Sequence, residues 1–401
     1  MNKKFIDNVN LKNKNILLRV DFNVPMDKEK KNITNHNRIK STLPTINYLL
    51  QQDINNLVIV SHLGRPKGKI VPELSLKLVQ EYLLKVINQN INLLSLDDYL
   101  KNKDKFNHSI TLIENIRFHP EEERNSDQDK ITLFENKLSQ LGDVFVNDAF
   151  GACHRNHCSI MGKGYNLKLG GLLLKSELKN IEKVMNNIKR PFTCIIGGAK
   201  VNDKIKLIYN LIDKVDYLLI GGGMVFTFLK VLYNMKIGNS LFDEEGSKYV
   251  TKIMKKAEEK NVKIVFPDYF MCGDSFSNDA KISLFDLKNG INDGYMGLDI
   301  GIKSIMKFEE YIYKSKTILW NGPIGVFEFS NFSSGSKVLI ESIRKLTDRL
   351  EADVVIGGGD TASCAQRFGL LGPSIHISTG GGATLTLLEG SEMPGIETLS
   401  E

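Results

Sequence analysis

Short apolar runs rich in β-branched residues alternate with longer segments of helical periodicity along the whole chain. This alternation is typical of βαβ units, which build a parallel sheet with helices on both faces. We therefore predict an α/β fold made of doubly wound parallel-sheet (Rossmann-like) domains. The expected strands are residues 15–21, 57–61, 110–113 and 143–146 in the first half, and residues 192–196, 217–220, 353–356 and 374–377 in the second.

Two domains are expected because the chain has 401 residues, whereas a single hydrophobic core stops growing at about 250 to 300 residues. An uninterrupted helical pattern runs from Leu172 to Lys189, and Pro191 cannot continue it. We interpret this segment as an interdomain helix. The predicted parts are an N-terminal domain (1–171), the interdomain helix with its hinge (172–190) and a C-terminal domain (191–387).

Composition and charge exclude several classes of protein. With 42% apolar and 25% charged residues, the chain fits an ordinary globular protein. Neither a window of about 20 apolar residues nor the apolar core of a signal peptide is found, so we expect a cytoplasmic protein without a membrane partner; a trimmed organelle precursor would look the same. The odd number of cysteines, five, predicts reduced thiols. We find no heptad pattern that would indicate an oligomer, so we expect a monomer.

Four expected strands of the second half run directly into glycine clusters. Glycine loops at the carboxyl ends of parallel strands let backbone N–H groups and helix N-termini approach a phosphate. Neither a Walker A motif nor a convincing G-x-G-x-x-G follows a strand, so a nucleotide would be held in another way. The clusters are residues 197–200, 221–223, 357–361 and 380–382.

Charged side chains stand next to two of these clusters. Lys200 and Lys204 are spaced by one helical turn, so both ammonium groups could reach one polyphosphate; a solvated lysine pair on a helix is the alternative. Asp360 and Thr361 are expected to open a helix. Asp360 is then either an N-cap or a carboxylate close to a nucleotide-bound Mg²⁺.

Cations follow the expected strands of the first half. Arginine binds carboxylates and phosphates through two parallel hydrogen bonds, so this edge is suited to a small phosphorylated acid. A zinc site at Cys153, His154, His157 and Cys158 is a weaker alternative, because no second pair of ligands is found. The cations and their polar neighbours are Arg19, Asp21, Asn23, Arg38, His62, Arg65, Arg117, His154, Arg155 and His157.

Several motifs together resemble the phosphoglycerate kinase family over essentially the full length of the chain. In the first half they are the segments Arg19–Pro25, Ser61–Pro66, Glu114–Phe118 and Asp148–Gly151 with His154 and Arg155. In the second half they are Gly197–Val201 with Asp203 and Lys204, Met296–Asp299, Trp320–Glu328 and Gly357–Ala362. We expect Trp320 itself to be a core residue.

The resemblance implies reversible phosphoryl transfer between 1,3-bisphosphoglycerate and ADP, giving 3-phosphoglycerate and ATP, with Mg²⁺ as cofactor. It also implies that residues 388–401 return to the first domain. The implied substrate-binding residues are Asp21, Asn23, Arg38, His62, Arg65, Arg117 and Arg155. The implied nucleotide-binding residues are Gly198, Ala199, Lys204, Gly223, Gly297, Leu298, Asn321, Pro323, Gly325, Glu328, Gly358, Gly359, Asp360 and Thr361, of which Asp360 serves the metal.

Phosphoryl transfer requires in-line positioning and compensation of charge on the equatorial oxygens. The nucleophile is a substrate carboxylate that is already ionised, so no general base is needed. We expect Arg38 and Lys200 to approach from opposite domains after the hinge closes. The glycine loops would add backbone N–H donors, so the expected catalytic groups are Arg38, Lys200, Gly359 and Gly382, with Gly358 and Gly381 beside them.

The sequence gives less support to two other functional classes than to a phosphotransferase. A nicotinamide-dependent oxidoreductase of similar fold lacks the expected fingerprint in its first βα turn. A nucleic-acid binder would rest only on the net charge of +6, which is mild for this length, and it would leave the glycine clusters unexplained. We therefore expect small-molecule substrates and no nucleic-acid partner.

Overall fold

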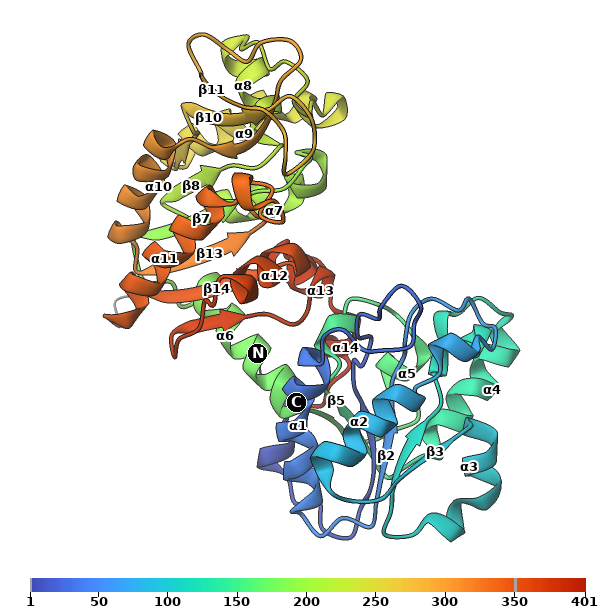
Figure 1. Ribbon diagram of the computed structural model, residues 1–401. Coiled ribbons are helices and arrows are strands. Elements are labelled where there is room, and N and C mark those ends of the chain that lie inside the picture. The colour runs from blue at the N-terminus through green and yellow to red at the C-terminus, as the bar shows by residue number, and fades with distance from the viewer. Residues whose placement is uncertain (1, 350–351) are drawn as a thin grey trace. The chain divides into compact units, whose positions relative to one another are not determined.

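The computed structural model describes residues 2–349 and 352–401 (Figure 1). The predicted domain ranges include Met1, Leu350 and Glu351, which lie outside the described residues. The chain divides into two compact units, Met1–Leu178 together with Glu392–Glu401, and Lys179–Ser391. The division falls within helix α6 (Leu172–Met185). The last ten residues of the chain therefore belong to the first unit.

The first unit is built on a six-stranded parallel sheet. Its strand order is β3-β4-β2-β1-β5-β6, and the register pairs Leu17 of β1 with Val58 of β2. Alternate side chains of a strand point to opposite faces, so Ile16 and Leu18 join one core cluster while Leu17 joins the other. The strands are β1 (Asn15–Arg19), β2 (Asn56–Val60), β3 (Ile91–Leu94), β4 (Ile110–Ile113), β5 (Val144–Asn147) and β6 (Lys168–Gly170).

Helices cover both faces of this sheet (Figure 1). They are α1 (Asn37–Leu50), α2 (Lys77–Ile87), α3 (Leu96–Asn102), α4 (Gln128–Ser139), α5 (Cys158–Met161) and α14 (Pro394–Glu397). The C-terminal α14 packs beside α5. It is held there because Gly395 N–H donates to the Cys153 carbonyl at 2.9 Å and the Asn147 side chain donates to the Gly395 carbonyl at 3.1 Å.

The second unit has a six-stranded parallel sheet of order β15-β14-β13-β7-β8-β9 and a small antiparallel sheet of order β11-β10-β12. The strands of the large sheet are β7 (Phe192–Ile196), β8 (Tyr217–Ile220), β9 (Lys263–Val265), β13 (Thr317–Asn321), β14 (Asp353–Gly357) and β15 (Ile375–Ile377). The small sheet contains β10 (Tyr269–Gly273), β11 (Ile282–Asp286) and β12 (Met296–Ile300). The helices are α7 (Ile205–Ile212), α8 (Val225–Tyr233), α9 (Glu244–Glu259), α10 (Ile302–Lys314), α11 (Ser334–Asp348), α12 (Gly359–Arg367) and α13 (Gly382–Leu388).

The predicted α/β class is confirmed, and every expected strand is present with ends shifted by at most two residues. Trp320 is fully buried, as expected. The predicted helix from residue 172 ends earlier, at Met185, because Asn186 and Asn187 follow and asparagine competes with the helical backbone for hydrogen bonds. No helix in the described ranges is long and apolar enough to cross a membrane.

Candidate active site

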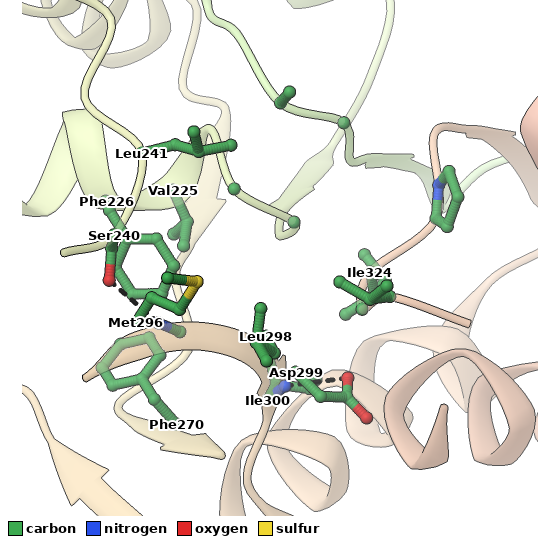
Figure 2. Close-up of a pocket in the computed structure, with 18 of the residues that line it drawn as sticks. Val225, Phe226, Ser240, Leu241, Phe270, Met296, Leu298, Asp299, Ile300 and Ile324 are labelled. Atoms are coloured by element: carbon green, nitrogen blue, oxygen red, sulfur yellow. Dashed lines mark hydrogen bonds between the residues drawn. The ribbon is translucent and has the colours of Figure 1, made fainter. Parts of the chain in front are cut away.

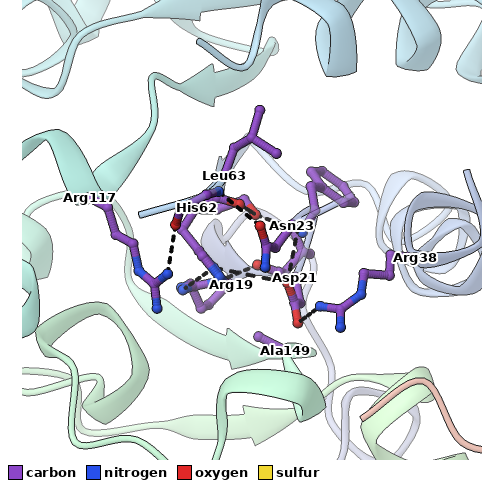
Figure 3. Close-up of polar contacts among 12 residues, drawn as sticks. Arg19, Asp21, Asn23, Arg38, His62, Leu63, Arg117 and Ala149 are labelled. Carbon is purple, nitrogen blue, oxygen red and sulfur yellow. Dashed lines mark hydrogen bonds and ion pairs between the residues drawn. The ribbon is translucent and has the colours of Figure 1, made fainter. Parts of the chain in front are cut away.

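The predicted acid-binding residues of the first unit gather around the carboxyl ends of its strands. Asp21 and Asn23 follow β1, His62 and Arg65 follow β2, and Arg117 follows β4. Arg155 follows β5, and Arg38 is the second residue of α1. Figure 3 shows Asp21, Asn23, Arg38, His62 and Arg117 turned toward a common region. Arg65 and Arg155 lie on the loops nearby, exposed and half-buried respectively.

Asp21 organises this edge. One carboxylate oxygen accepts a hydrogen bond from the Arg38 guanidinium (Figure 3). The other accepts from the Asn23 backbone N–H at 3.1 Å, and Asn23 Oδ1 in turn accepts from Gly64 N–H at 2.8 Å. The loops after β1 and β2 are thereby joined. Asp21 also leaves the rest of the Arg38 guanidinium, whose side chain is 31% exposed, available to an anion.

Arg117 is almost fully buried yet keeps its charge partners close. It donates to the Gly64 carbonyl at 2.8 Å and lies 3.1 Å from a Glu123 carboxylate oxygen. Burial lowers the pKa of Arg117 to about 10, so it remains a cation at neutral pH. Burial and the neighbouring arginines lower the pKa of His62 and of His157. The positive charge of the site therefore comes from arginine, not histidine.

A cavity of about 610 Å³ opens in the second unit at the ends of its parallel strands (Figure 2). The walls are mostly apolar, which is typical of a small-molecule pocket with a few polar groups at defined points. Ser240 accepts a hydrogen bond from Gly297 N–H at 2.9 Å and so fixes β12 at the wall. The predicted nucleotide residues that line the cavity are Gly198, Ala199, Gly223, Gly297, Leu298, Pro323, Gly325, Glu328 and Asp360.

The aromatic part of this wall was not predicted. Phe226 comes from α8, Phe270 from β10 and Phe276 from the loop after β10. Isolated aromatic residues such as Phe226 and Phe270 are as typical of a core as of a pocket, and Phe276 stands alone among polar residues, so the sequence held no signal for them. Gly297, by contrast, was predicted, and a Cβ there would overlap the Phe226 ring. Glycine at this position lets β12 pass close beside the ring.

The remaining predicted nucleotide residues form a second cluster at the ends of β13 and β14. Lys204 donates from Nζ to Oδ1 of Asn321, and Nδ2 of Asn321 is buried without a hydrogen-bond partner. Thr361 is buried and accepts from Gly322 N–H at 2.7 Å, which ties α12 to β13. Gly358 and Gly359 form the turn into α12, where Gly358 has a positive φ of 90°. A buried donor without a partner fits the oxygens of a phosphate.

Two expectations about local structure need correction. Lys200 lies in a nonhelical loop and α7 begins only at Ile205, so Lys200 and Lys204 are not one helical turn apart. Gly198, whose φ is 111°, keeps the backbone before Lys200 out of a helical conformation. Asp360 is not the N-cap of α12, because Gly358 occupies that position. The Asp360 carboxylate is instead exposed at the cavity, where it could approach a metal.

The cysteine and histidine cluster of the first unit does not form a metal site. In the described part of the chain, no three His, Cys, Asp or Glu side chains are grouped so as to hold a metal ion. Cys153 and Cys158 are buried, and burial raises the pKa of both thiols to about 12. The Cys158 thiol donates to the Glu121 carbonyl at 3.1 Å. Thiolates, which are the zinc-binding form, are therefore strongly disfavoured.

The sequence profile of the family described as phosphoglycerate kinase matches residues 6–391. The chain belongs to the phosphoglycerate kinase family. It is 47% identical to a phosphoglycerate kinase of Yarrowia lipolytica, with 100% of this chain and 99% of that protein covered. It is 46% identical to phosphoglycerate kinase 2 of Mus musculus, with 99% and 98% covered.

Solved structures of the family share the fold. The phosphoglycerate kinase from Coxiella burnetii superimposes with a TM-score of 0.86 at 35% identity, covering 99% of this chain and 98% of that one. The phosphoglycerate kinase from Pyrococcus horikoshii OT3 gives a TM-score of 0.82 at 28% identity with the same coverage. Membership of this phosphoglycerate kinase family makes the chain a phosphotransferase, and the nicotinamide and nucleic-acid alternatives are not supported.

Proposed function

We propose that this protein catalyses reversible phosphoryl transfer between 1,3-bisphosphoglycerate and ADP, giving 3-phosphoglycerate and ATP in glycolysis. The observation that carries the proposal is the pair of ligand sites with different chemistry in a chain of this family. One is an arginine-rich edge around Asp21 and Arg38. The other is an apolar cavity that ends in glycine loops and Lys204.

The acid substrate is bound by the predicted set Asp21, Asn23, Arg38, His62, Arg65, Arg117 and Arg155. Its phosphate and carboxylate are anions, and an arginine binds either through two parallel hydrogen bonds. The nucleophile in the ATP-consuming direction is the carboxylate, which is ionised at neutral pH. No residue has to remove a proton, which is consistent with the lowered pKa of the neighbouring His62 and His157.

The nucleotide base lies in the apolar cavity, with Gly297 and Leu298 at its wall and Glu328 near the ribose. The phosphates extend toward Lys204, Asn321 and the turn before α12. There the buried Nδ2 of Asn321 and the N–H groups of the glycine turn offer donors to oxygens that carry negative charge. The apolar walls supply affinity and the donors orient the reacting phosphate.

Charge on the transferring phosphoryl group is compensated by Arg38 and Lys200, with backbone N–H groups at Gly359 and Gly382. Because one ligand site belongs to each unit, transfer requires the sites to be brought together during turnover, which also keeps water from the phosphoryl group. The helix at Leu172 and the Pro394–Gly395 segment are the proposed hinges. We also propose a cytoplasmic, monomeric enzyme.

The metal is Mg²⁺, and the residues present fit it. Mg²⁺ in such enzymes takes one or two carboxylates together with substrate phosphates and water, and Asp360 offers an exposed carboxylate beside the phosphate end of the cavity. When bound, the metal neutralises phosphate charge. Asp360 would hold it, and Thr361, whose hydroxyl already accepts from Gly322, keeps α12 in place.

The test is ATP-dependent NADH oxidation with 3-phosphoglycerate, Mg²⁺ and coupling glyceraldehyde-3-phosphate dehydrogenase. We expect turnover that requires ATP, 3-phosphoglycerate and Mg²⁺. It should fall by orders of magnitude in Lys200→Ala, which serves as the background control. A folded, nucleotide-binding protein without turnover would contradict the proposed acceptor.

A further inference from the structure

Arg19 is a cation of the predicted basic edge that cannot touch a substrate. It is the last residue of β1 and its side chain is fully buried. Its guanidinium donates from Nε to Ser159 Oγ at 2.7 Å and from Nη1 to the Val20 carbonyl. The Nη2 atom lies 3.3 Å from Nδ1 of His62 (Figure 3). Among the predicted substrate-binding residues, Arg19 makes its side-chain hydrogen bond to His62.

Donor and acceptor roles in this cluster are determined by its chemistry. Glu122 is fully buried, and its Oε2 accepts from Ser159 N–H at 2.9 Å. The Ser159 hydroxyl donates its proton to Glu122 Oε1 at 2.6 Å, so Ser159 Oγ accepts from Arg19. The buried carboxylate thus fixes the hydroxyl, and the hydroxyl fixes the guanidinium.

The same reasoning determines the proton position on His62. An arginine carries donors and no acceptor, so Nδ1 of His62 must accept the hydrogen bond and carries no proton. The ring proton is then on Nε2. The competing carboxylate, Asp21, lies 4.0 Å from Nδ1, which is too far for a hydrogen bond. Asp21 is already engaged by Arg38 and by the Asn23 backbone.

We propose that Arg19, held by Ser159 and Glu122, is a positioning residue that keeps His62 a neutral imidazole donating from Nε2 to the bound acid. This proposal rests on the proposed function only for the identity of the acid. A neutral imidazole has two tautomers. If the proton is on Nδ1, the ring presents the lone pair of Nε2 to the anion; if the proton is on Nε2, the ring presents an N–H group. Arg19 selects the N–H group, which attracts the anion.

The charges around His62 support its neutral state. Burial lowers the pKa of His62, and Arg19, Arg38, Arg117 and His157 all act in the same direction. Asp21 is the nearby carboxylate that would favour the charged form, and its own ion pair with Arg38 offsets this. His62 therefore binds as a directed hydrogen-bond donor while the arginines supply the charge.

The direct test is long-range ¹H–¹⁵N spectroscopy of the histidine rings in the ligand-free, ¹⁵N-labelled full chain, with His62→Gln used to assign the signals. We expect an imine-type Nδ1 and a pyrrole-type Nε2 for His62, unchanged across the range around pH 6.5 in which an ordinary histidine titrates, ~5.5 to 7.5. A pyrrole-type Nδ1, or a titration within that range, would overturn the proposal. The wild-type spectrum decides this, and His62→Gln is needed only to assign the His62 signals.

A double variant, Arg19→Met with Glu122→Gln, tests the causal role of Arg19. The amide carbonyl introduced by Glu122→Gln can accept from Ser159 N–H, and the amide N–H₂ can donate to Ser159 Oγ once Arg19 no longer does, so no buried charge remains. The matched control is Arg124→Met with Glu135→Gln, because Arg124 donates to Glu135 at 2.5 Å in the same unit and its Nε donates to the Asn156 carbonyl rather than to a histidine.

In the Arg19 variant we expect mixed His62 tautomers, a His62 titration closer to pH ~6.5, and a KM for 3-phosphoglycerate raised about tenfold with kcat nearly unchanged, as for a lost uniform binding contact. The control should keep the wild-type spectrum and KM. Identical behaviour of the two double variants would refute a role for Arg19. If the wild-type tautomer is as expected but 3-phosphoglycerate neither shifts Nε2 nor turns over, the assigned substrate is wrong and the role of Arg19 stands.

Discussion

The Lys204 ammonium group, at the end of the turn that precedes α7, donates a hydrogen bond to Oδ1 of Asn321 at the end of β13. The contact joins two segments more than 100 residues apart in the sequence. Burial lowers the pKa of Lys204, and Nδ2 of Asn321 has no protein partner. A bound phosphate would therefore stabilise both groups: its negative charge would favour the Lys204 ammonium, and its oxygens would accept a hydrogen bond from Nδ2 of Asn321.

Replacing this lysine is expected to weaken nucleotide binding selectively. Lys204→Met keeps most of the buried side-chain volume but removes the cation. We expect the KM for ATP to rise about tenfold or more, as for one charge-assisted phosphate contact, while the KM for 3-phosphoglycerate stays near the wild-type value. Lys206→Met, an exposed lysine two residues further on, is the control. Equal effects of the two variants would contradict the assignment.

Arg38→Ala is expected to lower kcat by about 10² to 10³, the usual loss when one donor to transition-state charge is removed. The fold should survive, because the side chain is partly exposed and its hydrogen-bond partner Asp21 also accepts from the Asn23 backbone. Steady-state kinetics with a thermal melt of each protein would separate the two effects. Near-normal turnover would remove Arg38 from the mechanism.

Gly297→Ala is expected to damage the nucleotide cavity without changing any charge. The new methyl group would overlap the Phe226 ring, so the ring or β12 must shift, and both line the cavity proposed to hold the base. We expect an ADP dissociation constant raised about tenfold, within the cost range of overpacking, with 3-phosphoglycerate binding unchanged. Calorimetric titration with each ligand checks this, and unaltered ADP affinity would show that β12 does not border the base.

Asp148 is expected to make stability depend on pH. Its Oδ1 accepts from Leu174 N–H in the first turn of α6 at 2.9 Å, and burial raises its pKa to about 7, against ~3.9 in an unfolded chain. Over this interval the folded state holds a proton that the unfolded chain has released. The free energy of unfolding contributed by this group therefore falls as pH rises from ~4 to about 7, and stays at the lower value above.

Asp148→Asn removes this titration. The stability of the variant relative to wild type should therefore improve between pH ~5 and pH ~8, as measured by chemical denaturation at both values. Asp104→Asn, at an exposed carboxylate of the same unit, should show no such change. A relative stability of Asp148→Asn that is constant with pH would contradict the raised pKa.

The sequence by itself determined the α/β class, eight of the strands and the chemistry of their carboxyl ends. These features are local: apolar runs define strands, and glycines or arginines directly follow them. Asp21, His62 and Arg117 could be assigned to one edge because parallel strands of a sheet end on the same side. The strands β3, β6, β9 and β13 and the small antiparallel sheet were not predicted. Periodicity alone does not distinguish a short apolar run in a strand from one in a helix or a loop.

Only the tertiary structure decided which distant side chains meet. The aromatic wall of the cavity joins Phe226 and Phe270 from separate elements, and nothing in the local sequence distinguishes them from core residues. Likewise, Arg19 resembles its substrate-facing neighbours in sequence, yet packing against Ser159 buries it completely. Burial and contact depend on how sheet order and helix packing bring remote segments together, and that information is distributed over the whole chain.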